Sequence, residues 1–231
     1  MEKNNKGHSV VADAGTHRYM MQGSVVQSCM DMEARDLLVL KYTRYAPLPF
    51  VWREGIRGVL VLGGGGYMIQ RTLLTEHPDI TIDTVEIDPE ATRLAREYFF
   101  LEEDSRHTIY HEDAAAHIAA SAKEYDYIIQ DTFIENRVPQ NVRTKAHFAN
   151  IAARTSRGGL FMLNLIAPIE GDPLFRRTLR DIKRAFAFTR VFTVEDEYKP
   201  RALQNLVIYA AHTPFSVRGT EGMATGFELE L

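Results

Sequence analysis

Four apolar residues followed directly by four glycines constrain the fold of this chain more than any other feature. Residues 59–62 read Val-Leu-Val-Leu, and residues 63–66 are all glycine. A short run that is apolar throughout is typical of a parallel strand buried on both faces. Glycine lacks a Cβ and accepts positive φ, so glycines at a strand end allow a tight turn and a close approach to a ligand. The pattern predicts a strand that ends at a ligand-binding loop.

A second apolar run ends in acidic residues. Glu86 lies 20 residues after Gly66, close to the spacing at which an acidic side chain meets a ribose in dinucleotide-binding folds. An ionised carboxylate can accept a hydrogen bond from each of the two ribose hydroxyls. We therefore expect a nucleoside-binding strand–helix–strand unit, and we assign to the ligand site Gly63, Gly64, Gly65, Gly66, Glu86 and its neighbour Ile87.

The glycine loop does not match the pattern for a diphosphate. The dinucleotide pattern G-x-G-x-x-G needs a third glycine, and that place holds Met68 or Ile69 in the two possible registers. No Gly-Lys-Ser/Thr sequence follows, which excludes a P-loop. A glycine loop with an acidic ribose ligand but no diphosphate pattern fits an adenosyl thioether better than NAD or ATP.

Composition narrows the class of protein. The 231 residues fit one domain with a small appendage, and the net charge of −4 favours neither nucleic acid nor an anionic membrane as a partner. The single cysteine excludes an intramolecular disulfide and argues against a cysteine-based metal site, and the scattered histidines show no metal-binding spacing, so no metal is expected. No apolar run approaches the ~20 residues that span a bilayer. Residues 1–8 lack the apolar core of a signal peptide, so we expect a cytoplasmic protein.

Strands and helices alternate along most of the chain. Residues 10–30 are typical of a small β-hairpin region, and residues 32–46 of a helix stopped by prolines. Repeated strand–helix units predict an α/β, doubly wound, mostly parallel sheet whose last strand is a candidate antiparallel edge. We place the N-terminal region at residues 1–50 and the Rossmann-like nucleoside-binding domain at residues 51–231. Expected strands are 59–62, 81–87, 107–111, 125–130, 160–165, 190–194 and 206–211; expected helices are 67–76, one from Pro89 capped by Asp88, 114–122, 144–155 and 172–186.

Two further carboxylates follow expected strands. Ligands of open α/β sheets bind outside the carboxyl ends of the strands. Asp113 could accept from an adenine amino group, cap the next helix, or do both. Asp131 faces the position where a transferable group would project, and Tyr127 and Tyr198 are possible helpers, although core positions are commoner for such tyrosines. The basic run within 176–184 has helical spacing and is more typical of a solvated helix face than of a nucleic-acid site.

Several of these segments together resemble the spermidine synthase family, aminopropyltransferases built on the S-adenosylmethionine-dependent methyltransferase fold. The resemblance is strong over residues 59–131 and weaker over the rest of 19–165. The matching segments are 59–65 with V-L-x-x-G-G-G, 85–88 with E-I-D, 111–113 with the short G-D turn, 125–131 with Y-D-x-I-x-x-D, 23–27 with D-G-x-x-Q, Glu33 with the D-E pair and 47–48 with the closing P-L.

The resemblance implies a class I methyltransferase fold with an N-terminal β-hairpin region and usually a dimer or tetramer; we expect a homodimer. It implies S-adenosylmethionine or its decarboxylated form as co-substrate and a small-molecule acceptor, an amine or a hydroxyl. By the same carry-over Glu86 holds the ribose, Asp113 the adenine and catalytic Asp131 the acceptor, and Gln27 joins the cofactor-binding residues.

Three positions depart from the family pattern. Gly66 replaces the aspartate of G-G-G-D-G, which contacts the charged end of the aminopropyl donor. Ile134 replaces the second acid of D-x-x-D, with Glu135 a possible substitute, and Gln22 replaces the acid of D-G-x-x-Q. Because an ammonium without a carboxylate partner is costly to desolvate, these changes predict poor spermidine synthesis from putrescine.

The sequence therefore leaves three functions open. A spermidine-synthase-like transferase is expected, with methyl transfer slightly favoured over aminopropyl transfer. A diverged polyamine aminopropyltransferase is the alternative within the same chemistry. A non-catalytic nucleoside-binding protein is the alternative outside it, because a fold alone does not settle function.

Overall fold

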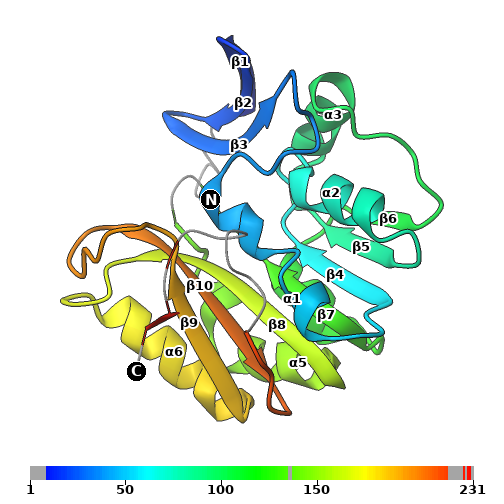
Figure 1. Cartoon of the computed structure of the whole chain (residues 1–231). Helices are drawn as coiled ribbons and strands as arrows, with labels where there is room; N and C mark the ends of the chain where they lie inside the picture. Colours follow the sequence, from blue (N-terminus) through cyan, green and yellow to red (C-terminus); the bar gives the residue numbers. More distant parts are fainter. Residues whose placement is uncertain (1–8, 135–136, 218–225, 227, 230–231) are drawn as a thin grey trace, which may run out of the picture.

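A computed structural model describes residues 9–134, 137–217, 226 and 228–229, arranged as two sheets (Figure 1). The first is a three-stranded antiparallel sheet of β1 (Ser9–Ala14), β2 (His17–Gln22) and β3 (Val25–Asp31). The second has eight strands in the order β11-β9-β10-β8-β7-β4-β5-β6. The two sheets together confirm the expected α/β Rossmann-like methyltransferase fold, with a mostly parallel sheet and an N-terminal hairpin region.

The parallel half of the large sheet follows the expected alternation. Each strand leads into a helix that returns over the sheet, because a parallel strand pair needs a crossover connection. The elements in chain order are β4 (Gly58–Leu62), α2 (Met68–Glu76), β5 (Thr81–Val85), α3 (Pro89–Tyr98), β6 (His107–Tyr110), α4 (Ala114–Ala120), β7 (Tyr125–Gln130), the 3₁₀ turn η2 (Asn141–Arg143), α5 (Lys145–Arg154) and β8 (Thr155–Ala167). Asp88 caps α3 as expected, since its Oδ1 accepts from the Glu90 N–H at 3.1 Å.

The expectation that the last long strand forms the sheet edge is wrong. After α6 (Pro173–Ala185) the chain forms β9 (Phe188–Thr193) and then β10 (Gln204–Ala211). β10 is antiparallel as expected, but it lies between β8 and β9, and β11 (Glu228–Leu229) pairs outside β9. β10 is almost wholly buried, and pairing with β8 on one side and β9 on the other satisfies its backbone N–H and C=O groups away from water.

The expected helix over residues 32–46 is also wrong. This segment consists of turns followed by the 3₁₀ helix η1 (Lys41–Tyr45) and the short helix α1 (Pro49–Trp52). The Asp31 carboxylate accepts from the Glu33 N–H at 2.9 Å and starts a turn. Arg44 then donates to the backbone carbonyl of Leu38 at 2.9 Å. These contacts with side chains replace the hydrogen bonds that an α-helix would have provided.

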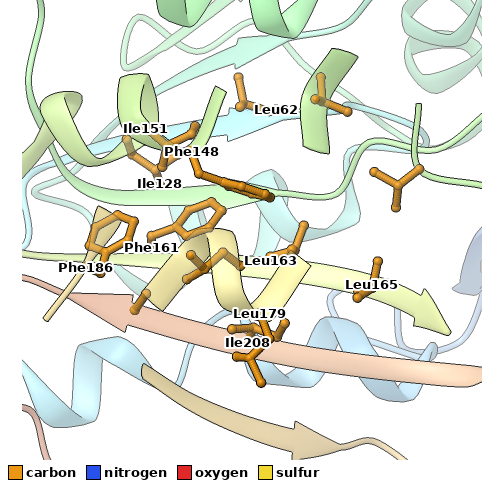
Figure 2. Packing of buried hydrophobic residues seen from close by; sticks show 14 of the residues in the cluster. Leu62, Ile128, Phe148, Ile151, Phe161, Leu163, Leu165, Leu179, Phe186 and Ile208 are labelled. Carbon is orange, nitrogen blue, oxygen red and sulfur yellow. The ribbon is translucent and has the colours of Figure 1, made fainter. Parts of the chain in front are cut away.

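Two layers of side chains cover the large sheet. Along β4, Leu60 and Leu62 point to the face covered by α4, α5 and α6, and Val59 and Val61 to the face covered by η1, α1 and α2. Figure 2 shows the first layer, where Phe148 of α5 and Phe161 of β8 pack together. Burial on both faces explains why β4 is apolar throughout.

The three-stranded sheet packs against helices α2 and α3. Met20 and Met30 are buried against Leu94 of α3 and Met68 of α2. This packing places β3 beside the loop that follows β4, so the N-terminal sheet contributes side chains to the region where a ligand is expected. No described helix has the length and apolar character needed to cross a membrane.

Candidate functional site

A cavity of about 400 Å³ lies at the carboxyl ends of the parallel strands, where open α/β sheets bind ligands. Its walls come from the N-terminal sheet, η1, the loops after β4, β5, β6 and β7, and the ends of β8, β9 and β10. All of the predicted site residues except Gly66 line it, namely Gly63, Gly64, Gly65, Glu86, Ile87, Asp113, Asp131 and Gln27. The structure therefore brings together residues that are more than 100 positions apart in the sequence.

The N–H groups of the glycine loop are all bonded within the protein. Each N–H group of residues 63–67 already has an acceptor: the carbonyl of Val85 for Gly63, the Glu86 carboxylate for Gly64 and Gly65, Ser28 Oγ for Gly66 and the carbonyl of Gly64 for Tyr67. The loop thus presents no unpaired N–H group to an anion. This arrangement agrees with the absence of a diphosphate pattern in the sequence.

Gly63 lets two strand ends meet. Its φ is +104°, and a Cβ at this position would lie 2.2 Å from the backbone oxygen of Asp131. Only glycine allows both the left-handed backbone and this contact. The Asp131 backbone is thereby held directly beside the glycine loop, and its side chain lines the cavity.

Gly66 differs from its neighbours because it faces the N-terminal sheet. A Cβ there would lie 2.8 Å from Ser28 Cβ and 3.1 Å from the Phe99 ring. Tyr67 follows at a left-handed φ of +57°, and its fully buried ring fills the space below Gly64. The Tyr67 hydroxyl pairs with Thr92 Oγ1 at 2.7 Å. Because Ser28 belongs to β3, the family's aspartate at position 66 would collide with this strand.

Glu86 is buried and holds the loop. One carboxylate oxygen accepts from the Gly64 N–H at 2.7 Å and the Gly65 N–H at 3.3 Å, and the other accepts from the Asp88 N–H at 2.8 Å. An ionised carboxylate has about four acceptor positions, and three N–H groups already bond to Glu86. The contact of Glu86 with a ribose stays a prediction.

Asp113 caps α4 and also faces the cavity. Its Oδ1 accepts from the Ala116 N–H at 2.9 Å, and its Oδ2 accepts from Asn141 Nδ2 at 2.7 Å. The helix-cap role that the sequence left open is present in the structure. The predicted adenine contact remains a prediction.

Asp131 is held by hydrogen bonds from two sides. The Tyr42 hydroxyl donates to Oδ2 at 3.0 Å, and Asn164 Nδ2 donates to Oδ1 at 2.9 Å. Asn205 Nδ2 donates in turn to Asn164 Oδ1 at 2.9 Å and fixes its orientation. Burial raises the pKa of Asp131 above its usual value, although the two hydrogen bonds act in the opposite direction. A carboxylate with a raised pKa at fixed orientation is suited to accept a proton.

One ion pair lies on the cavity wall. Lys41 Nζ lies 2.9 Å from Glu195 Oε2, and both residues line the cavity. The remaining carboxylates on the wall are Glu86, Asp88, Glu112, Asp113 and Asp131. Among the described lining residues, Lys41 is the only lysine or arginine. The described part of the chain contains no group of three or more side chains that could hold a metal ion.

Sequence reasoning did not identify Tyr42, Asn164, Asn205 and Ser28 as site residues. Asn164 gave a signal, because it is a polar residue inside the apolar run of β8. Tyr42 gave none, since it was placed in a helix that does not form. Of the suggested helpers, Tyr127 is buried in the core and Tyr198 is exposed, and neither lines the cavity. Ile134 lines it, whereas Glu135 lies outside the described residues.

Comparison with known proteins gives one consistent family. The spermine/spermidine synthase domain matches residues 45–215. A polyamine aminopropyltransferase of Bacillus mycoides is 29% identical over 178 residues, covering 74% of this chain and 64% of the relative. The chain thus spans less than two thirds of that relative's length.

Solved structures agree on the fold. A probable spermidine synthase from Corynebacterium glutamicum superposes with a TM-score of 0.80 at 23% identity, covering 96% of this chain and 87% of the other. Human methyltransferase-like protein 13 in complex with SAH gives a TM-score of 0.62 at 22% identity, with 75% and 81% covered. Together with the domain match over residues 45–215, the glycine loop and the acidic strand ends show that the chain belongs to the spermine/spermidine synthase family.

Proposed function

We propose that this protein transfers an aminopropyl group from decarboxylated S-adenosylmethionine to an acceptor amine, with Asp131 as the residue that orients and deprotonates the amine. The observation that carries the proposal is the charge of the cavity. Six carboxylates line it, and the single lysine among the described lining residues is paired with Glu195.

This charge distribution favours the decarboxylated donor over S-adenosylmethionine. Decarboxylated S-adenosylmethionine carries a sulfonium and an ammonium and has no carboxylate, so an acidic wall suits it. S-adenosylmethionine adds a carboxylate, which needs a cation or N–H donors when it leaves water. The N–H groups of the glycine loop all have acceptors within the protein, and Lys41 has Glu195.

The proposed step needs few groups. The amine nitrogen, after giving up a proton, forms a bond to the carbon that joins the aminopropyl chain to sulfur. The carbon–sulfur bond breaks, and its electron pair stays on sulfur as a neutral thioether, 5′-methylthioadenosine. Asp131 accepts the proton, while the hydrogen bonds from Tyr42 and Asn164 hold the carboxylate in one orientation.

Methyl transfer from S-adenosylmethionine is the second candidate, and Gly66 is the observation that favours it. The family's aspartate at this position contacts the charged end of the aminopropyl donor, and here the position is glycine packed against Ser28. The comparisons support the aminopropyl alternative better, because the family domain and the curated relative are aminopropyltransferases by name.

The experiment that tests the proposal supplies each donor in turn. Purified protein is incubated with decarboxylated S-adenosylmethionine or with S-adenosylmethionine and a panel of primary amines, and the adenosyl product is identified by mass spectrometry. We expect 5′-methylthioadenosine from the decarboxylated donor. Formation of S-adenosylhomocysteine instead would assign methyl transfer, and neither product with any amine would favour the non-catalytic alternative.

A further inference from the structure

The Lys41–Glu195 ion pair joins two segments that are 154 positions apart in the sequence. Lys41 begins η1, and Glu195 follows β9. The Lys41 ammonium lies 2.9 Å from the Glu195 carboxylate and 3.8 Å from Asp196. The two cavity-lining side chains are 40% and 50% exposed, which leaves them open to an entering molecule.

Each member of the pair is next in the sequence to a residue that is linked by hydrogen bonds to Asp131. Lys41 directly precedes Tyr42, whose hydroxyl donates to Asp131. On the other side, Glu195 directly follows Val194, whose N–H donates to the Asn205 carbonyl at 3.3 Å. The Asn205 side chain reaches Asp131 through Asn164. The ion pair therefore shares one cavity with Asp131 and is connected through the backbone to both groups that hold the Asp131 carboxylate.

The described lining residues that come next after Asp131 and after Asn164 in the sequence are uncharged. Phe133 and Ile134 follow Asp131, and Ile166 lies two residues after Asn164 on β8. Ile134 is 46% exposed and stands where the family pattern has its second acid. Glu86 and Asp113, the acidic strand ends assigned to the nucleoside, already accept backbone N–H groups. Glu195 is therefore the cavity carboxylate that we assign to a second ammonium, and Lys41 already neutralises it.

We propose that Lys41 determines acceptor specificity, so that the enzyme prefers a primary amine with an uncharged, largely apolar remainder and discriminates against diamines. The inference rests on the proposed aminopropyl transfer. A monoamine presents its nitrogen to Asp131 and its hydrocarbon remainder to Phe133, Ile134 and Ile166. The second ammonium of a diamine must compete with the Lys41 ammonium for Glu195, and like charges at short range repel.

The experiment compares two acceptors of equal length, butylamine and 1,4-diaminobutane, with decarboxylated S-adenosylmethionine as donor. The quantity measured is the ratio of their kcat/KM values. We expect the wild-type protein to favour butylamine by about fivefold, the upper end of the effect of one ion pair at an accessible site. Lys41→Met frees Glu195 for the second ammonium and should shift the ratio about fivefold toward the diamine.

Three further variants separate this role from a structural one. Lys41→Arg keeps the charge and should keep the preference for butylamine. Adding Glu195→Gln to Lys41→Met removes the carboxylate and should return the preference to butylamine. Arg57→Met is the control, because it removes an exposed ion pair with Asp79 at 3.0 Å outside the cavity lining and should leave the ratio unchanged.

The outcomes distinguish this inference from the proposed function. If products form but the wild-type protein favours the diamine, or if Lys41→Met leaves the ratio unchanged, the specificity role is overturned while aminopropyl transfer stands. If neither the wild-type protein nor any variant forms product with either amine, the proposal of aminopropyl transfer fails. The specificity role is then decided by calorimetry in the presence of 5′-methylthioadenosine: Lys41→Met must still shift the ratio of the two amine dissociation constants toward the diamine.

Discussion

At the scale of single residues, three buried or half-buried side chains that can carry a charge, Asp131, Glu86 and His147, define testable properties of the protein. Burial raises the pKa of Asp131, and Glu86 binds the glycine loop through one carboxylate oxygen and the Asp88 N–H through the other. His147 is buried beside Gln130, and burial lowers the pKa of its imidazole to about 4. Each of these positions gives a prediction.

Asp131→Asn should lower kcat by about two to four decades, the usual contribution of a general base. The amide keeps the shape of the carboxylate but cannot take the proton. Binding of 5′-methylthioadenosine, measured by calorimetry, should change little, because Asp131 lies beyond the glycine loop and Glu86. Asp79→Asn, at an exposed carboxylate far from the cavity lining, is the control. Retained activity in folded Asp131→Asn would remove Asp131 from the chemistry.

Glu86→Gln should weaken the binding of 5′-methylthioadenosine by about one to two decades, because a charge-assisted acceptor is lost. The amide –NH₂ would also face an N–H group of Gly64, Gly65 or Asp88, so the free energy of unfolding should fall as well. Calorimetry and urea unfolding measure the two effects separately. An unchanged dissociation constant in a destabilised variant would make Glu86 purely structural.

His147 should make stability depend on pH. Burial lowers its pKa from 6.5 to about 4, so the unfolded chain takes up a proton that the folded chain does not. Stability is therefore fully present above about pH 6.5 and is lost as the pH falls toward 4, by about 2 kcal/mol between pH 7 and pH 5. Glutamine cannot titrate, so urea unfolding of His147→Gln should show a fall in the free energy of unfolding between pH 7 and pH 5 that is smaller by this amount. Equal losses in both proteins would contradict the prediction.

At the scale of elements, the contact between the glycine loop and β3 explains a departure from the family pattern. Ser28 of β3 accepts the Gly66 N–H at 2.7 Å, and its Cβ occupies the space that a side chain at position 66 would need. The two elements are 38 residues apart in the sequence, so the loop pattern alone does not show this constraint.

Gly66→Asp should therefore lower the free energy of unfolding by about 1–3 kcal/mol through overpacking against Ser28 and Phe99. Ser28→Gly in the same chain removes the nearest obstructing atoms and should recover part of the loss. Urea unfolding of the two single variants and the double variant measures the coupling between the sites. Strictly additive effects would show that the two positions do not interact.

At the scale of the whole molecule, the boundary placed at residue 50 stays a prediction, and so does the homodimer. Side chains from both sides of this boundary share cores. Tyr45, Ala46 and Leu48 pack with the large sheet, and Met20 and Met30 pack with α2 and α3. These contacts predict that the two regions unfold together.

Met30→Ala tests this cooperativity. It should destabilise the protein by about 2–5 kcal/mol, the cost of a buried cavity. The single tryptophan, Trp52, packs in the cluster on the large sheet rather than in the cluster of Met30, with its ring 4.9 Å from that of Tyr209. Its fluorescence should shift with the same change in Tm as the circular dichroism signal. A fluorescence transition that stays at the wild-type Tm would show two independent units.

The sequence by itself determined the parallel strands, most of the helices and the cluster of acidic strand ends. These features follow from local rules: an apolar run must be buried, Asp88 before Pro89 caps a helix, and parallel strands end at one edge of a sheet. The place of β10 inside the sheet and the irregular segment 32–40 were decided only by the tertiary structure. So were the partners of Asp131 and the Lys41–Glu195 pair, because these contacts join residues 33 to 154 positions apart and no local pattern encodes them.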